Sequence, residues 1–115
     1  MFGKRTRTKQ RRVGPVSIID LSGDVTEHDQ ETVKSAYAEV LKQEPERILL
    51  NFSEVEYINT SGIAVLIAMV MDAEKKGRKI GFFGMSPHYC KVFTLVRLPL
   101  YADLYQDEAE ALGSK

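Results

Sequence analysis

The chain has 115 residues, of which 43% are hydrophobic and 28% are charged, and its formal net charge is zero. This length and composition are those of one ordinary globular domain with a single core. The longest apolar run, residues 63–71, is too short to span a bilayer, and the N-terminus lacks the apolar segment of a secretory signal. The lone cysteine, Cys90, excludes an internal disulfide, so a cytoplasmic protein is expected.

The basic residues are unevenly distributed along the chain. Residues 1–12 carry six Lys or Arg and no acid, which leaves residues 13–115 with a net charge of −6. Such a basic segment can contact nucleic acid, anionic lipid or an acidic partner, or it can be a solvated tail or a charged edge strand. No aromatic or repeated basic pattern favours nucleic-acid binding. We therefore interpret residues 1–12 as a basic, flexible tail on a domain formed by residues 13–115, without direct nucleic-acid or membrane contact.

From residue 16 onward, β-branched runs alternate with amphipathic segments. Residues 16–21 predict a strand that ends at the turn residues 22–24, and residues 9–13 are a weaker candidate for a preceding strand. Apolar residues at spacings of three and four predict a helix over residues 26–44, which Pro45 ends. The further predicted elements are a strand over 47–52, a helix over 60–76, a strand over 79–84, a helix from Pro87 to Leu98, a strand over 100–105 and a helix over 107–112.

This alternation of strands and helices predicts the fold class. The nearly continuous apolar character of residues 47–52 is typical of a strand buried on both faces of a parallel sheet. Alternating strands and helices are joined by crossovers that place helices against such a sheet. We therefore expect an α/β domain with a four- or five-stranded, mostly parallel sheet and helices packed against it.

Residues 58–71 are the most informative stretch, because a polar cluster there precedes an apolar helix. Asn59 can cap this helix with its side chain. Thr60 and Ser61 fall in the first turn, where free N–H groups and the helix dipole favour an anion. Taken alone, the same pattern also fits a well-capped core helix.

A step of 100° per residue divides the helix over residues 60–76 into two faces. The broad apolar arc, formed by Ile63, Leu66, Met69, Val70 and Ala73, is expected to press on the sheet. The opposite face suits either a partner protein or coverage by the preceding helix. The residues expected to contact a partner are Asn59, Thr60, Ser61, Ala64, Ile67, Ala68 and Met71.

The segment Asn-Thr-Ser-Gly-Ile at residues 59–63, after the apolar strand, resembles the signature of the STAS domain family, typified by bacterial anti-sigma factor antagonists. The resemblance covers residues 13–112 and includes Leu-Ser-Gly-Asp at 21–24 and Leu-Val-Arg-Leu-Pro-Leu at 95–100. It implies that the phosphorylated residue, which in the family follows an aspartate, is Thr60, with Ser61 as the neighbouring candidate. Asn59 replaces the usual aspartate, so the cap is kept while a negative charge is lost.

The resemblance implies an anti-sigma factor antagonist. Its partner would be an anti-sigma factor with serine/threonine kinase activity, and binding would release a sigma factor until phosphorylation of Thr60 or Ser61 ended the interaction. The alternative is a constitutive STAS subunit of a transporter or stress-sensing assembly. Nucleotide binding by the domain itself is a third hypothesis, and weak homodimerisation stays open.

The residues indicate no enzymatic chemistry. His28, His88 and Cys90 lack the spacing of metal ligands, and no base is placed beside a nucleophile. A phosphate-binding glycine loop is also missing from the sequence. We therefore expect a regulatory protein that is not an enzyme and that uses no metal or cofactor.

Overall fold

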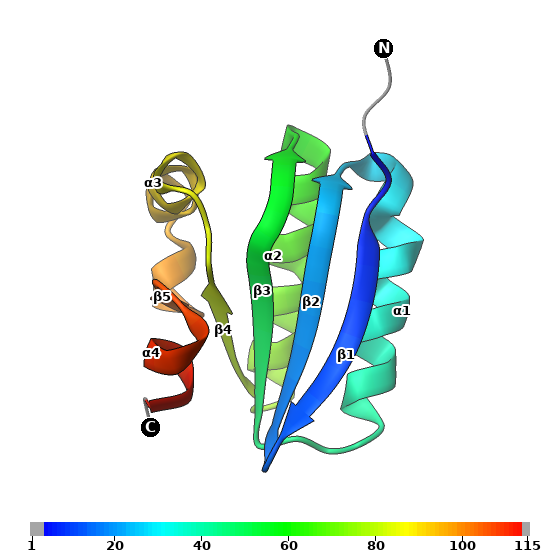
Figure 1. The fold of residues 1–115 in the computed structure, drawn as a ribbon, viewed down its shortest axis with the longest axis vertical. Helices are drawn as coiled ribbons and strands as arrows, with labels where there is room; N and C mark the ends of the chain where they lie inside the picture. The colour runs from blue at the N-terminus through cyan, green and yellow to red at the C-terminus, as the bar shows by residue number, and fades with distance from the viewer. Residues whose placement is uncertain (1–3, 114–115) are drawn as a thin grey trace.

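The computed structural model describes residues 4–113, which form a five-stranded sheet with helices on both faces (Figure 1). The strand order follows the sequence, from β1 to β5. β1 is antiparallel to β2, and every other neighbouring pair is parallel, which confirms the expected α/β fold. The elements are β1 (Arg7–Val13), β2 (Val16–Val25), the 3-10 turn η1 (Glu27–Asp29), α1 (Gln30–Leu41), β3 (Arg47–Ile58), α2 (Thr60–Lys75), β4 (Lys79–Phe83), α3 (Pro87–Leu95), the 3-10 turn η2 (Leu98–Leu100), β5 (Asp103–Tyr105) and α4 (Glu108–Gly113).

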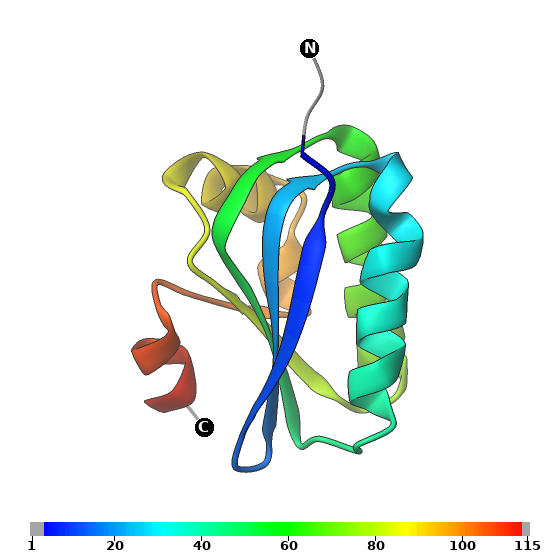
Figure 2. The same cartoon turned by 45° about the vertical axis from the view of Figure 1, so that its right-hand side comes forward.

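The two long helices, α1 and α2, lie side by side on one face of the sheet, and α4 lies on the other (Figures 1 and 2). The main core lies under α1 and α2, and Phe93 of α3 extends it beside Phe82 of β4. On the opposite face, Ala111 of α4 packs in a smaller cluster with apolar residues of β2, β3 and β4. The strands in the middle of the sheet are therefore buried on both faces only where α4 covers them.

The orientation of α2 agrees with its sequence periodicity. Leu66, Met69, Val70 and Ala73 are all buried against the sheet, and Ile63 is half-buried. The apolar arc thus holds α2 in place, and the other face of the helix is left for α1 and for solvent.

The strands β2 and β3 both run further than their apolar runs predict. The expected turn at residues 22–24 is instead the second half of β2, which pairs with residues 54–58 of β3. Gly23 adopts a φ of +85° between two shifts of register, so a glycine bulge lies where a turn was expected. Pairing between the two strands therefore continues beyond the apolar core, and β3 ends at Ile58 rather than at Phe52.

Other boundaries also differ from the expectation. The helix expected over residues 26–44 consists of η1 followed by α1, because Thr26 and Asp29 form a capping box that fixes a separate 3-10 turn. The last strand is only three residues long, since η2 takes up the start of the expected segment.

Four of the six basic residues in the segment 1–12 belong to the sheet: Arg7, Lys9, Arg11 and Arg12. β1 pairs with residues 16–22 of β2, so the boundary expected at residue 12 does not separate a tail from the domain. Arg11 explains why a strongly basic strand is held against β2 and α4. Its guanidinium donates two hydrogen bonds to Asp20, of 2.7 and 2.9 Å, and two to Glu108. A charged edge strand, one of the interpretations of the basic residues given above, is the one that the structure shows for residues 7–13.

Candidate functional site

Asn59 joins the end of β3 to the start of α2 and uses both ends of its amide group. Its Oδ1 accepts a hydrogen bond of 2.8 Å from the backbone N–H of Gly62, so the expected helix cap is present. Its Nδ2 donates a hydrogen bond of 2.7 Å to the carboxylate of Glu27 in η1. This contact places a carboxylate beside the helix N-terminus, although residue 59 itself is uncharged.

Thr60 and Ser61 open α2 at the carboxyl end of β3. Both residues are exposed, and within residues 4–113 neither their hydroxyls nor their backbone N–H groups have a hydrogen-bond partner. Two backbone donors and two hydroxyls are therefore free at the positive end of the α2 dipole. The site offers exposed hydroxyl groups where added negative charge is favoured within the domain.

The backbone around this site is fixed by two other elements. A Cβ atom on Gly62 would overlap the carbonyl oxygen of Val25, so α2 can approach the end of β2 this closely only with glycine at that position. Tyr89 of α3 binds the last residue of β3 through its hydroxyl, which accepts from the N–H of Ile58 at 2.8 Å. These two contacts fix the backbone before and after Thr60 in the chain, at Ile58 and at Gly62.

A stripe of small and apolar residues continues from Thr60 along α2. Ala64 and Ala68 are exposed, and Ile67 and Met71 are half-buried. Because a helix advances 100° per residue, these four side chains lie within one narrow arc that also contains Thr60. α1 packs beside Val65 and Met69 and reaches only the edge of this arc at Ala68, so it does not cover the stripe.

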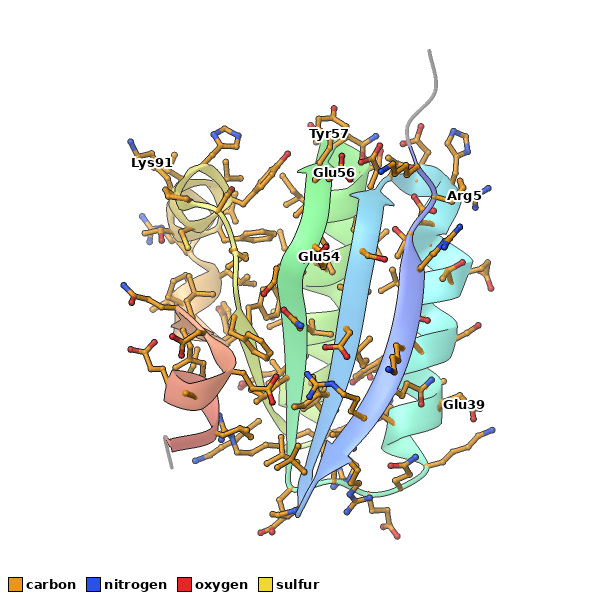
Figure 3. All side chains as sticks on the ribbon, viewed as in Figure 1. Arg5, Glu39, Glu54, Glu56, Tyr57 and Lys91 are labelled. Carbon is orange, nitrogen blue, oxygen red and sulfur yellow. The ribbon has the colours of Figure 1, made fainter. Side chains whose placement is uncertain are left out.

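Acidic and aromatic side chains surround the site. The hydrogen bond from Asn59 is the main cause that lowers the pKa of Glu27 below its usual value, which keeps this carboxylate ionised. Glu56 and Tyr57 lie at the same end of the sheet, and Tyr57 is 51% exposed (Figure 3). Reasoning from the sequence missed Glu27 and Tyr57: Glu27 lies on another element, and strand residues beyond Phe52 were not expected in the sheet.

Other kinds of site find no support in the described residues. No helix within residues 4–113 is both long and apolar enough to cross a membrane. The same part of the chain holds no group of three or more His, Cys, Asp or Glu side chains that could bind a metal ion. The hydroxyl cluster at the start of α2 is therefore the best candidate for a functional site.

A family model described as "Mlab, STAS domain" matches residues 8–99. The chain belongs to the STAS domain family. The match runs from β1 to η2, so it includes the whole Asn59–Ser61 segment and nearly all of the sheet of this STAS domain.

Solved structures share the fold of this STAS domain. An anti-sigma factor antagonist from Mycobacterium paratuberculosis matches with a TM-score of 0.81 and 21% identity, over 94% of this chain and 92% of that chain. The phosphorylated form of the Bacillus cell fate determinant SpoIIAA matches with a TM-score of 0.71 and 20% identity, over 93% and 97% of the two chains. A variant of RsbS from Moorella thermoacetica has a TM-score of 0.73 and 17% identity, over 93% and 92%.

Proposed function

We propose that this STAS domain is an anti-sigma factor antagonist whose binding surface is the start of α2 and the stripe that follows it. The partner is an anti-sigma factor with serine/threonine kinase activity, and its capture frees a sigma factor. Transfer of phosphate to Thr60, or alternatively to Ser61, ends the interaction. The observation that carries the proposal is the exposed Thr60 hydroxyl, unpartnered within residues 4–113, at the first position of a capped helix.

The geometry supports a surface on which a phosphate is stable in the free domain but destabilises the complex with the partner. In the transfer, Thr60 Oγ1 attacks the γ-phosphorus of ATP, the bond to ADP breaks, and the hydroxyl proton passes to a base of the partner kinase. The product adds about −1.5 to −2 charges beside the free N–H groups of α2, where the helix dipole favours them. In a closely packed interface the same charge must be desolvated next to Glu27, which destabilises the complex.

The stripe supplies the shape that such an interface needs. The exposed Ala64 and Ala68 let a partner backbone approach closely, and the half-buried Ile67 and Met71 add apolar area. Tyr57 offers an exposed aromatic side chain at the same end of the sheet, the kind of residue that often dominates binding energy. The structural neighbour from Mycobacterium paratuberculosis is an anti-sigma factor antagonist, which agrees with this role.

The test begins with purification of the partner from the source organism and its identification by mass spectrometry. Wild-type protein, Thr60→Ala, Ser61→Ala and Thr60→Asp are then compared for binding and, with ATP, for phosphate uptake by intact mass and site mapping. We expect Thr60→Ala to bind without being phosphorylated, Ser61→Ala to remain a substrate, and Thr60→Asp to fold but lose binding. Ser35→Asp, which adds the same charge on the far flank of α1, is the matched control and should bind normally.

Phosphate on Ser61 alone would move the modified position by one residue. A Thr60→Asp protein that binds its partner as tightly as wild type, together with no phosphate uptake, would overturn the switch. That result would favour a constitutive subunit of a transporter or stress-sensing assembly, in which the same surface binds without regulation.

A further inference from the structure

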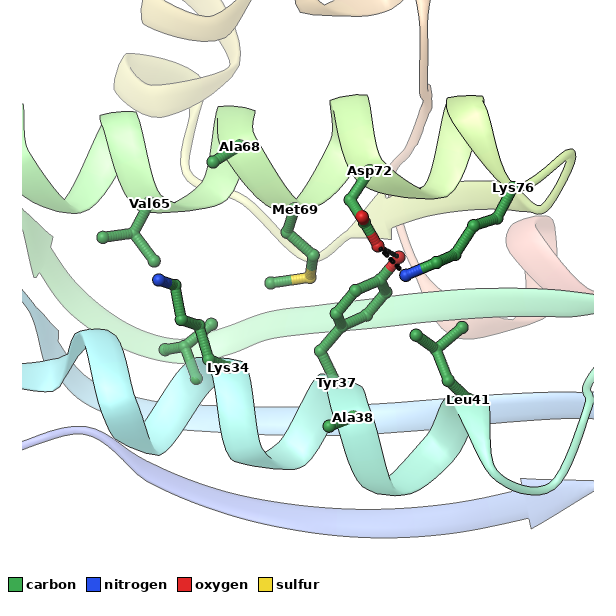
Figure 4. Close-up of a pocket in the computed structure, with 10 residues that line it drawn as sticks. Lys34, Tyr37, Ala38, Leu41, Val65, Ala68, Met69, Asp72 and Lys76 are labelled. Carbon is green, nitrogen blue, oxygen red and sulfur yellow. Dashed lines mark hydrogen bonds and ion pairs between the residues drawn. The ribbon is translucent and has the colours of Figure 1, made fainter.

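An apolar groove runs between α1 and α2 and borders the stripe at Ala68 (Figure 4). It encloses about 390 Å³, which lies within the range of small-molecule sites in proteins. Its walls are Val33 and Leu41 from α1 and Val65 and Met69 from α2. Two exposed alanines, Ala38 on α1 and Ala68 on α2, line the rim, where their small side chains leave the groove open.

One end of the groove is closed by a satisfied polar cluster. The hydroxyl of Tyr37 donates to Asp72 Oδ2 at 2.7 Å, and the ammonium of Lys76 donates to the same oxygen at 2.7 Å (Figure 4). These two hydrogen bonds lower the pKa of Asp72, so the carboxylate stays ionised and is neutralised by Lys76. No uncompensated negative charge therefore lines the groove.

The other end of the groove carries a free positive charge. The ammonium of Lys34 lies beside Val65 (Figure 4), and within residues 4–113 it forms no hydrogen bond or ion pair. The acidic residues of α1, Glu31 and Glu39, lie on the opposite flank of the helix, toward β1. The charges of α1 are thus segregated, with the acids away from the groove and an unpaired lysine at its mouth.

We propose that this groove binds a medium-length acyl chain with a carboxylate head group. The chain occupies the apolar trough between Val33 and Met69, and the head group pairs with Lys34. Apolar walls with one cation at the end are complementary to such an amphiphile. A neutral apolar molecule would leave the charge of Lys34 unpaired, and a dianion would find no second cation near Lys34. Binding adds no covalent step and leaves the Thr60 hydroxyl exposed.

The test is calorimetric titration of the full chain with decanoate and, separately, with decanol, together with ¹H–¹⁵N NMR shifts. We expect saturable binding of decanoate, several-fold weaker binding of decanol, and shifts centred on residues 33–41 and 65–72. Ala38→Leu and Ala68→Leu fill the rim and should each abolish detectable binding, while Ala109→Leu, on the opposite face of the sheet, should not. Lys34→Gln should weaken decanoate by about three- to fivefold, as expected for a partly exposed ion pair, without affecting decanol.

Lys91→Gln, on α3, is the control for loss of a surface charge and should bind decanoate normally. The absence of saturable binding would overturn the proposal. So would shifts centred on the exposed apolar residues Leu95 and Leu100, because the ligand would then occupy the η2 region. Equal weakening of decanoate and decanol by Lys34→Gln would show that the lysine shapes the rim rather than pairing with the head group.

Discussion

The side-chain amide of Asn59 donates a hydrogen bond to Glu27 while its carbonyl oxygen caps α2. A carboxylate at position 59 could provide only the second of these contacts, because an ionised carboxylate accepts hydrogen bonds and donates none. The carboxylate near the helix N-terminus therefore belongs to Glu27 of η1 and not to residue 59. The hydrogen bond between the two side chains also ties η1 to the start of α2. The departure from the usual aspartate is therefore matched by a partner elsewhere in the fold.

Asn59→Asp should lower the thermal midpoint of unfolding, because two carboxylates would face each other where the amide now donates. Glu27→Gln in the Asn59→Asp background should restore the midpoint, since the glutamine amide can donate to Asp. Circular dichroism melts of wild type, Asn59→Asp, Glu27→Gln and the double variant at pH 7 and low salt measure this coupling. If the double variant were no more stable than Asn59→Asp alone, the two residues would not be coupled.

Gly62→Ala should destabilise the domain by about 1–3 kcal/mol, the usual cost of forcing extra volume into a closely packed site. The added methyl would overlap the carbonyl oxygen of Val25 and push α2 away from β2. Urea unfolding measures the loss, and Gly113→Ala, where a Cβ meets no neighbour, is the control that should leave stability nearly unchanged. If Gly62→Ala were as stable as wild type, the start of α2, which carries Thr60, would not be held against β2.

Deletion of residues 1–9 should lower the thermal midpoint clearly, although the sequence alone suggests a dispensable tail. Asp29 is 1% exposed, and its carboxylate accepts from Arg5 Nε at 2.9 Å and from the Thr6 N–H at 3.0 Å. The deletion removes both donors and the start of β1, which leaves a buried carboxylate partly unsatisfied at a cost of about 1–3 kcal/mol. Lys9→Gln, which removes one charge but keeps the strand, should melt like wild type; an unchanged midpoint in the deletion would show that β1 contributes nothing.

Acid should weaken the domain through Asp20. The hydrogen bond from Arg11 is the main cause that holds the pKa of Asp20 below its usual value, and Asn51 adds to it against the effect of burial. Since the folded pKa lies below the unfolded value of about 4, this stabilisation is present above pH 4 and is lost as the pH falls through the folded pKa.

Urea unfolding between pH 7 and pH 2 should therefore show a falling free energy of unfolding below about pH 4. Asp20→Asn should be less stable than wild type at pH 7 and should show a smaller decline in acid. Asp24→Asn is the control, because the Asp24 carboxylate makes no hydrogen bond within residues 4–113. An equal decline in wild type and Asp20→Asn would assign the acid sensitivity to other carboxylates.

The sequence by itself determined the features that depend on local periodicity and capping. Leu66, Val70 and Ala73 are four and three residues apart, and this spacing set the buried face of α2. The position of Asn59 before Thr60 set its first turn. The first turn follows from contacts within one or two helical turns. The buried face follows from the need to cover the apolar side of the helix, which any sheet can do. The same local signals placed the exposed hydroxyls at the start of α2.

Only the tertiary structure decided which distant residues meet. Glu27 reaches Asn59, Arg11 of β1 pairs with Glu108 of α4, and Tyr37 closes the groove against Asp72, each across elements far apart in the chain. The second halves of β2 and β3 carry too few apolar residues to mark a strand, and they are extended because each satisfies the backbone hydrogen bonds of the other. Such pairings depend on how the elements assemble, so a local pattern of residues does not specify them.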